Sequence, residues 1–197
     1  MNMRIYRAAA VVLLAVAGSP VLRAEVLVGD AALGPGGTFG DYALTLASSE
    51  GLFMVAFDFA GGDLYGFSAS GNGYSIAEGL RLFEASYGTA LTPAFAAGTT
   101  PLFDNSSPAD WQISIPLDTS IYLAYWDDRQ TFDYAPTAND GYGWIQLTHT
   151  ASGLEGSASA TALGGGIVVG TTTAIPEPSA MALFILGGLA LIRRPGK

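Results

Sequence analysis

Two residue types that often serve as catalytic bases and nucleophiles, histidine and cysteine, are almost absent from this 197-residue chain. His149 is the only histidine, and the chain has no cysteine. A nucleophilic triad needs the imidazole beside a hydroxyl, with a carboxylate to orient it. No serine of this chain stands in a Gly-x-Ser-x-Gly turn. In "YGWIQLTHT" the histidine is in phase with Ile145 and Leu147, which predicts a structural position at a strand end, near the edge of the core.

Paired carboxylates are the second kind of catalytic group to consider. Two carboxyl groups held across a cleft hydrolyse glycosidic bonds, and the candidates are Asp127, Asp128, Asp133 and Asp140. Neighbouring residues of a strand point to opposite faces, so Asp127 and Asp128 form such a pair only if they lie in a loop. Solvated loop charges are the simpler interpretation. We therefore expect a protein that is not an enzyme.

Metal sites are restricted by the same composition. Without cysteine there is no thiolate ligand, and a histidine-based zinc centre needs several imidazoles. Acidic loops at 104–110 ("DNSSPAD") and 127–133 ("DDRQTFD") carry the oxygen ligands that calcium prefers. Neither loop has the spacing of an EF-hand, so we predict no metal ligands and keep calcium only as an alternative.

A pair of aromatic residues is the candidate for ligand binding. Tyr142 and Trp144 share one face of a predicted strand with Gln146 and Thr148, opposite the aliphatic residues. If that face points outward, the two rings can stack on sugar rings, as in a lectin-like module. The alternative is a strand buried on both faces, because Trp and Tyr are mostly core or core-edge residues.

The elements that position these residues are predicted to be strands. Apolar and polar residues alternate in "DWQISIPLD" (110–118) and "LFMVAFDF" (52–59), and Gly, Pro, Asn and Asp separate such segments. Only 75–86 ("SIAEGLRLFEAS") fits a helix, and it fits a strand equally well. We expect an all-β, antiparallel β-sandwich or jelly roll over residues 25–165, followed by a Gly/Thr-rich linker at 166–174.

Charge excludes one class of partner. Residues 25–174 contain 16 acidic residues against two basic ones, Arg81 and Arg129. A body this acidic repels phosphate backbones, so nucleic acid is not an expected partner.

The N-terminus has the pattern of a secretory signal peptide. Basic residues precede an apolar run of 11 residues, Ala8–Gly18, which is too short to span a bilayer. Cleavage after Ala17 or Ala24 fits the small-residue rule, and we prefer Ala24. The signal peptide is then residues 1–24, and the protein is exported.

The C-terminus combines three features in a fixed order. Pro176, Glu177 and Pro178 keep the backbone extended. Residues 179–192 then form an uncharged stretch of 14 residues, about 21 Å long as a helix. Arg193 and Arg194 follow directly, in the arrangement of a membrane segment with its basic flank in the cytoplasm.

This tail, residues 175–197, resembles the bacterial PEP-CTERM sorting signal, also catalogued as an ice-binding-protein C-terminal domain. The match rests on the motif Pro176-Glu177-Pro178, the helix 179–192 and the basic end. "IYLAYWDD" and "DGYGWIQLTHTASG" are also similar to a strand pair that often precedes such tails.

The resemblance implies processing by exosortase, a membrane enzyme, in a Gram-negative bacterium that makes exopolysaccharide and forms biofilm. The precursor would be anchored in the inner membrane, and the product would reach the cell surface or the extracellular matrix. Exopolysaccharide is then an expected partner. The ice-binding name belongs to the tail and implies no ice-binding activity.

Overall fold

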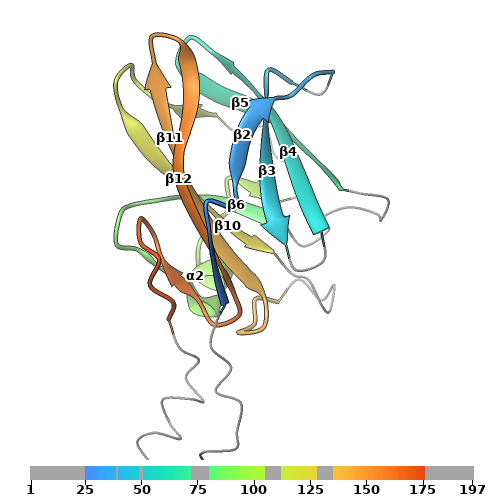
Figure 1. Ribbon diagram of the computed structural model, residues 1–197, viewed down its shortest axis with the longest axis vertical. Helices are drawn as coiled ribbons and strands as arrows, with labels where there is room; N and C mark the ends of the chain where they lie inside the picture. Colours follow the sequence, from blue (N-terminus) through green and yellow to red (C-terminus); the bar gives the residue numbers. More distant parts are fainter. Residues whose placement is uncertain are drawn as a thin grey trace, which may run out of the picture.

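The computed structural model describes residues 25–38, 40–48, 51–71, 80–104, 112–127 and 135–175. Within these ranges the chain consists almost entirely of antiparallel strands, with one short helix (Figure 1). The all-β, antiparallel prediction is therefore confirmed. The strands form a six-stranded sheet, a five-stranded sheet and a small two-stranded ribbon.

The five-stranded sheet is built from hairpins. Glycine supplies the positive φ that the tight β4–β5 turn needs, at Gly61 (φ 65°) and Gly62 (φ 91°). Alternation buries Val55 and Phe57 on one face, and a bulge follows Ala56. The order of strands is β2 (Ala32–Pro35), β3 (Tyr42–Ser48), β4 (Gly51–Ala60), β5 (Asp63–Gly71) and β9 (Ile113–Ser114).

The six-stranded sheet contains the longest strand of the described chain. It resolves the ambiguous segment 75–86 in favour of a strand for Leu80–Ala85, while 75–79 lie outside the described residues. Its order is β1 (Glu25–Val28), β12 (Gly153–Leu163), β11 (Gly141–Thr150), β10 (Ser120–Asp127), β6 (Leu80–Ala85) and β8 (Phe103–Asp104).

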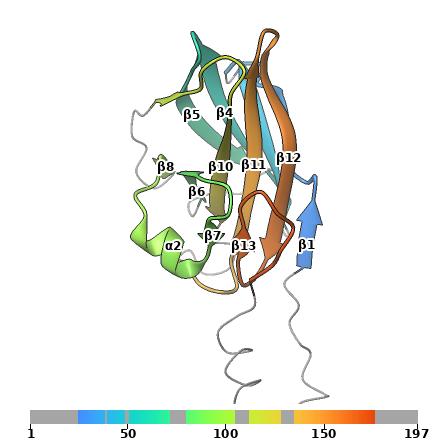
Figure 2. The same ribbon diagram turned by 90° about the vertical axis from the view of Figure 1, so that its left-hand side faces the viewer.

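The two large sheets face each other across a continuous apolar cluster, which we call the inner core (Figure 2). Its side chains come from alternate positions of strands in both sheets, as expected when one face of each sheet is buried. The inner core consists of Leu44, Leu46, Val55, Phe57, Leu64, Leu80, Leu82, Phe103, Ile113, Ile115, Leu123, Tyr125, Ile145, Leu147 and Leu154.

The N-terminal segment joins the two sheets along one side. β1 pairs with the end of β12, and β2 pairs with β3 in the other sheet. Between them, Gly29 has a φ of 70° and donates its N–H to the Ser159 carbonyl. The Ser159 hydroxyl bonds the backbone of Ala31. The chain thus changes sheets through a short bend that is fixed to β12.

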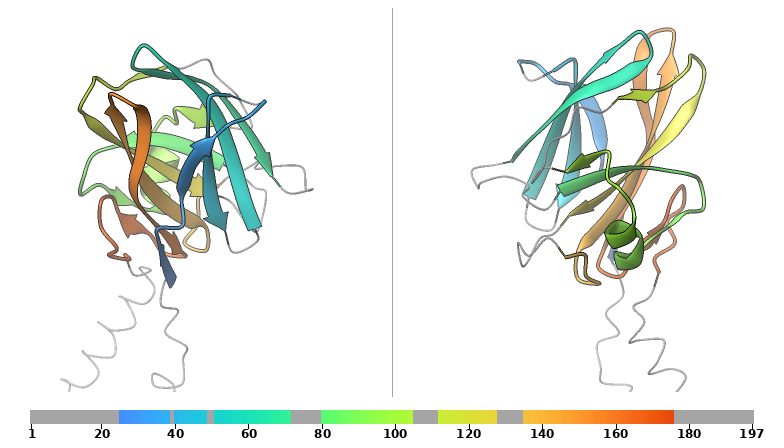
Figure 3. Two further views of the ribbon diagram at one scale, coloured as in Figure 1. Left: turned by 45° about the horizontal axis from the view of Figure 1, so that its top comes forward. Right: turned by 180° about the vertical axis from the view of Figure 1, so that it is seen from behind.

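The other face of the six-stranded sheet is covered over one half by a small cap (Figure 3). The cap comprises β7 (Ala90–Leu91), α2 (Pro93–Gly98) and β13 (Ile167–Val168), and β13 pairs with β7. The cluster beneath it, here the outer core, consists of Phe83, Leu91, Ala96, Ala124, Trp126, Tyr142, Trp144, Ala160, Ala162, Ile167 and Val169.

Residues 166–174 were expected to be a linker, and the structure contradicts this. Ile167 and Val169 are fully buried, and Val169 donates its N–H to the Thr89 carbonyl. A β-bridge joins Ile167 to Ala174. Small residues are typical of linkers, but here they allow the backbone to lie close to β7, since a Cβ at Gly166 would come within 2.3 Å of the Leu91 carbonyl oxygen.

Both ends of the described chain lie at the same end of the body. Glu25 pairs with Leu163, the last residue of β12. Ile175 donates its N–H to the carbonyl of Gly166, just beyond that strand. Figures 1 and 2 agree on this placement, with β1 and the segment after β13 ending close together.

Candidate functional site

The two aromatic residues expected to form a sugar-binding face are buried. Tyr142 is 1% exposed and Trp144 is 4% exposed. The Tyr142 hydroxyl donates to the Thr137 carbonyl (2.6 Å), and Trp144 Nε1 donates to the Thr171 carbonyl (3.0 Å). The alternation that put both rings on one face was right, but the cap covers that face, so neither ring offers a platform to a ligand.

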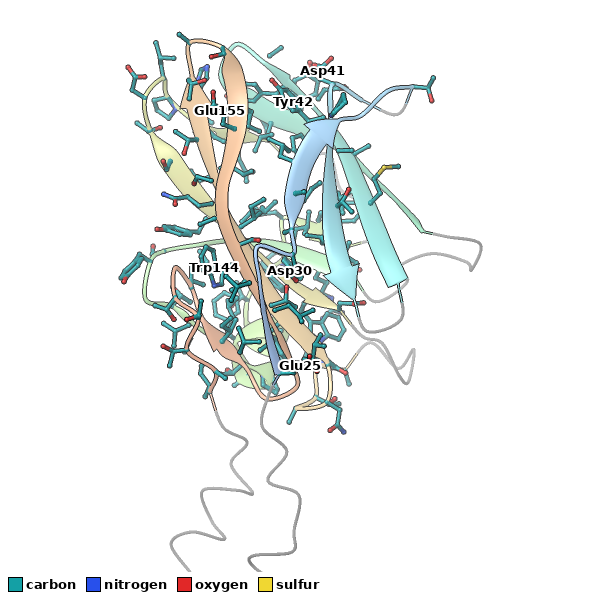
Figure 4. The ribbon with its side chains drawn as sticks, in the orientation of Figure 1. Glu25, Asp30, Asp41, Tyr42, Trp144 and Glu155 are labelled. Atoms are coloured by element: carbon teal, nitrogen blue, oxygen red, sulfur yellow. The ribbon has the colours of Figure 1, made fainter. Side chains whose placement is uncertain are left out.

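The other half of the same face is not covered by the cap. Figure 4 shows Trp144 in the capped half and Glu155 toward the far end of β12. The sheet face beyond Trp144, which we call the open face, carries Tyr122, Gln146, Thr148, Ser120 and Ser157, with Tyr87 of the β6–β7 turn beside it.

Two aromatic residues of the open face, Tyr87 and Tyr122, were not among the binding residues predicted from the sequence. Tyr87 is 67% exposed, and its ring centroid lies 6.1 Å from that of Tyr122. Tyr122 is half-buried, and its ring meets the Trp144 ring edge-on at 5.8 Å. The alternation of "SIYLAYW" does place Tyr122 on the same face as Ala124 and Trp126. Tyr87 gave no such signal, because it lies in a turn.

His149 has the structural position predicted for it. Its Nδ1 lies 2.7 Å from the Ile115 carbonyl oxygen, and its ring meets the Phe59 ring edge-on at 4.9 Å. Because His149 belongs to β11 while Phe59 belongs to β4 and Ile115 follows β9, the imidazole joins the two large sheets. Its backbone also exchanges hydrogen bonds with Asp118 and Thr119.

Two of the four candidate carboxylates are buried, contrary to the expectation of solvated loop charges. Asp127 is 3% exposed and Asp140 is 1% exposed. Asp140 Oδ2 accepts from Trp126 Nε1 (2.9 Å) and from the backbone N–H of Thr137 (2.6 Å), and Oδ1 accepts from the Thr137 hydroxyl (3.0 Å). Asp140 therefore fixes the loop before β11. Asp128 and Asp133 lie outside the described residues.

Arg81 supplies positive charge beside this region. Its Nε donates to Asp104 Oδ2 at 2.8 Å, and its guanidinium carbon lies 4.8 Å from the centroid of the Trp126 ring. The ion pair links β6 to β8, and the cation–π contact holds the indole from one side while Asp140 accepts its N–H. These contacts fasten the sheet edge and leave Arg81 engaged by its neighbours.

Among the described residues there is no group of three or more acidic or histidine side chains placed to hold a metal ion. Most of the two acidic loops considered for calcium, 105–110 and 128–133, lies outside the described ranges. One carboxylate oxygen, Asp30 Oδ1, is buried without a hydrogen-bond partner, while Oδ2 accepts from the Thr161 hydroxyl. A single oxygen of this kind does not make a cation site.

The tail residues Pro176, Glu177, Pro178, Arg193 and Arg194 lie outside the described residues, as does the expected helix 179–192. In the part of the chain that is described, no helix is long and apolar enough to cross a membrane. The described body continues to Ile175, whose N–H is hydrogen-bonded to Gly166. The Pro-Glu-Pro motif therefore follows the folded cap without an intervening linker.

Comparison with known proteins adds no relative to this picture. No family model, no curated protein and no solved structure shows a significant match to the chain.

Proposed function

We propose that this chain is a non-enzymatic exported protein of a Gram-negative bacterium, delivered to the cell surface or extracellular matrix by a PEP-CTERM tail that exosortase recognises. The observation that carries the proposal is the order of three features after the body: Pro-Glu-Pro at 176–178, an uncharged stretch at 179–192, and Arg193-Arg194. An N-terminal signal peptide, cut after Ala24, would leave β1 whole, because that strand begins at Glu25.

The position of the chain ends supports an anchored precursor. β1, which begins at Glu25, and the segment after β13, which runs to Ile175, lie at one end of the body (Figure 2). A helix at 179–192 spanning the inner membrane would hold that end toward the bilayer. The opposite end, with the β4–β5 turn at Gly61 and the β11–β12 turn at Ser152, would point away from it. A β-sandwich held in this way would present its turns and the open face to the periplasm until the tail is processed.

The bonding of His149 and Asp140, the two candidate catalytic residues whose contacts are described, is consistent with a non-enzymatic body. The only imidazole, His149, bonds a backbone carbonyl through Nδ1 and packs on Phe59. Asp140 bonds the Trp126 indole and Thr137. Each group performs a task that keeps the fold together, and none of these contacts directs it toward a shared reaction centre.

A lectin-like function based on Tyr142 and Trp144 is not favoured, because both rings are buried in the outer core. Calcium assistance has no support from the described carboxylates.

The sorting proposal is tested by intact-mass analysis of the protein recovered from its native host, with both termini read. We expect an N-terminus at Glu25 and a C-terminus near residues 174–178. Pro176→Ala combined with Glu177→Ala should abolish the C-terminal cut and leave the protein in the membrane fraction. Glu84→Ala, which removes an exposed carboxylate of the body, is the matched control and should be processed normally. Recovery of a wild-type C-terminus at Lys197 would contradict the proposal.

A further inference from the structure

The open face holds its aromatic rings in fixed positions. The Tyr87 ring is 67% exposed, yet it lies directly on the backbone of Gly170. A Cβ at Gly170 would come within 2.3 Å of the Tyr87 ring, and Gly170 has a φ of 78°. Because Gly170 has no Cβ, the exposed Tyr87 ring can pack directly on its backbone.

The Tyr122 ring is also held in place by its neighbours. It stands on the central strand β10 and packs edge-on against Trp144, which is itself bonded to Thr171. Its ring is inclined by 57° to that of Tyr87. Two solvent-accessible rings, each supported by buried structure, form a preorganised pair that loses little conformational entropy when a ligand packs on it.

Polar side chains continue the surface from Tyr122 across the sheet. Gln146 stands opposite Tyr122 in the β10–β11 register, and its Oε1 accepts from the Ser157 hydroxyl at 3.1 Å. The hydroxyls of Ser120 and Thr148 lie 2.8 Å apart in the next row. Amide and hydroxyl groups both donate and accept, as the hydroxyls of a ligand do. The open face thus pairs apolar rings with uncharged hydrogen-bonding groups.

Charge selects among ligands that carry many hydroxyls. Glu155 is exposed and stands opposite Thr148 in the β11–β12 register. Arg81, the only lysine or arginine among the described residues, is paired with Asp104 and packed on Trp126 in the capped half of the sheet. Within the described ranges, an anionic chain would meet a carboxylate on the open face and no compensating cation, so like-charge repulsion disfavours it.

We propose that the open face binds a neutral polysaccharide, with Tyr87 and Tyr122 stacking on neighbouring sugar residues and Gln146, Ser157 and the Ser120–Thr148 pair bonding their hydroxyls. Stacking uses the C–H face of a sugar ring, the polar row offers partners to the sugar hydroxyls, and the exposed Glu155 carboxylate favours a neutral chain over an anionic one. The site lies in the body and does not depend on how the tail is processed. The binding proposal is therefore tested independently of the sorting proposal.

The test is affinity electrophoresis of the full chain in detergent micelles, through gels that contain dextran, galactomannan, glucomannan or xyloglucan, with alginate as the anionic comparison. We expect retardation by at least one neutral polymer and none by alginate. Tyr87→Ala, which removes an exposed ring, should weaken binding by about tenfold, as should Tyr122→Ala. Tyr65→Ala removes a 39% exposed ring from β5 in the other sheet and is the matched control.

Each result decides the inference. Retardation that Tyr87→Ala weakens about tenfold and Tyr65→Ala leaves unchanged supports it, with far-UV circular dichroism verifying that the variants fold. Absence of retardation in all four neutral polymers overturns it, as does equal binding to alginate. Binding that Tyr65→Ala reduces as much as Tyr87→Ala would place the ligand elsewhere and would also overturn it.

Discussion

The two faces of the six-stranded sheet are buried in different ways. Along β10, Leu123 and Tyr125 point into the inner core, while Ala124 and Trp126 point into the outer core. The inner face meets a whole second sheet, mainly through branched aliphatic side chains. The outer face meets only short segments, and alanines at its centre, including Ala160, allow their backbones to approach closely.

The second sheet and the cap are held against the six-stranded sheet by different interactions. The inner core depends on the area of apolar surface removed from water, which is spread over many side chains. The cap has a smaller apolar contact and is held also by directional bonds, from Trp144 to Thr171 and from Val169 to Thr89. Beyond Trp144 the outer face of the sheet carries polar side chains, and the cap does not cover it. We therefore expect substitutions in the inner core to destabilise the whole body, and substitutions beneath the cap to loosen the cap first.

The largest effect is expected from Leu123→Ala in the inner core. Leu123 is fully buried on a central strand, and a leucine-to-alanine change in such a site costs about 3 kcal/mol because it removes apolar contacts and leaves a cavity. Urea unfolding followed by tryptophan fluorescence should show one transition at a lower midpoint. Leu117→Ala, at a residue that is 54% exposed, should leave the midpoint nearly unchanged. If both variants unfold at the same midpoint, the inner core is not the main source of stability.

The inner core was largely predictable from the sequence because it follows from alternation. Val55 and Phe57 in "LFMVAFDF" are buried together, as the period of two requires. Prediction failed at the strand end in "DWQISIPLD", where Ile113 and Ile115 are buried but Leu117 is exposed. Pro116 ends the pattern there, since the chain turns through Asp118, a non-glycine residue with a φ of 59°.

The cap could not be predicted in the same way. Its sequences, "TPAFAAG" around α2 and "GGGIVVGTTT" around β13, are short and rich in small residues. A pattern of one or two apolar residues does not indicate what an element packs against. The burial of Tyr142 and Trp144 was therefore undecidable from their strand alone, because the sequence gives the phase of a strand but not whether something covers its second face.

A smaller and more local effect is expected from Trp144→Phe beneath the cap. The change keeps an aromatic ring in the outer core but removes the N–H that donates to Thr171. The lost hydrogen bond and the smaller ring should together cost about 2 kcal/mol. Because Thr171 belongs to the segment that closes the cap, hydrogen exchange should accelerate at the amides of Val168 and Val169 before global unfolding.

Leu123→Ala serves as the comparison for this exchange experiment. It should raise exchange across both sheets, without preference for the cap. If Trp144→Phe instead raised exchange uniformly, the cap and the inner core would form one cooperative unit, and the distinction between the two covers would be lost.

The smallest effect is expected at the start of α2, where a single cap residue orients the helix. Thr92 Oγ1 accepts from the backbone N–H of Phe95 at 3.3 Å, and Pro93 follows at the first helical position. Thr92→Ala should cost about 1 kcal/mol, because the N-terminal amides of a helix have no other partner within it. Thr92→Ser keeps the oxygen and should recover most of the loss, as measured by urea unfolding. Since α2 contributes Ala96 to the outer core, the faster exchange caused by Thr92→Ala should be confined to residues 92–99 and to β7. An equal loss in both variants would assign the role of Thr92 to its methyl group, which packs near Gly166, and the helix would then be held by contact with the closing segment and not by its own cap.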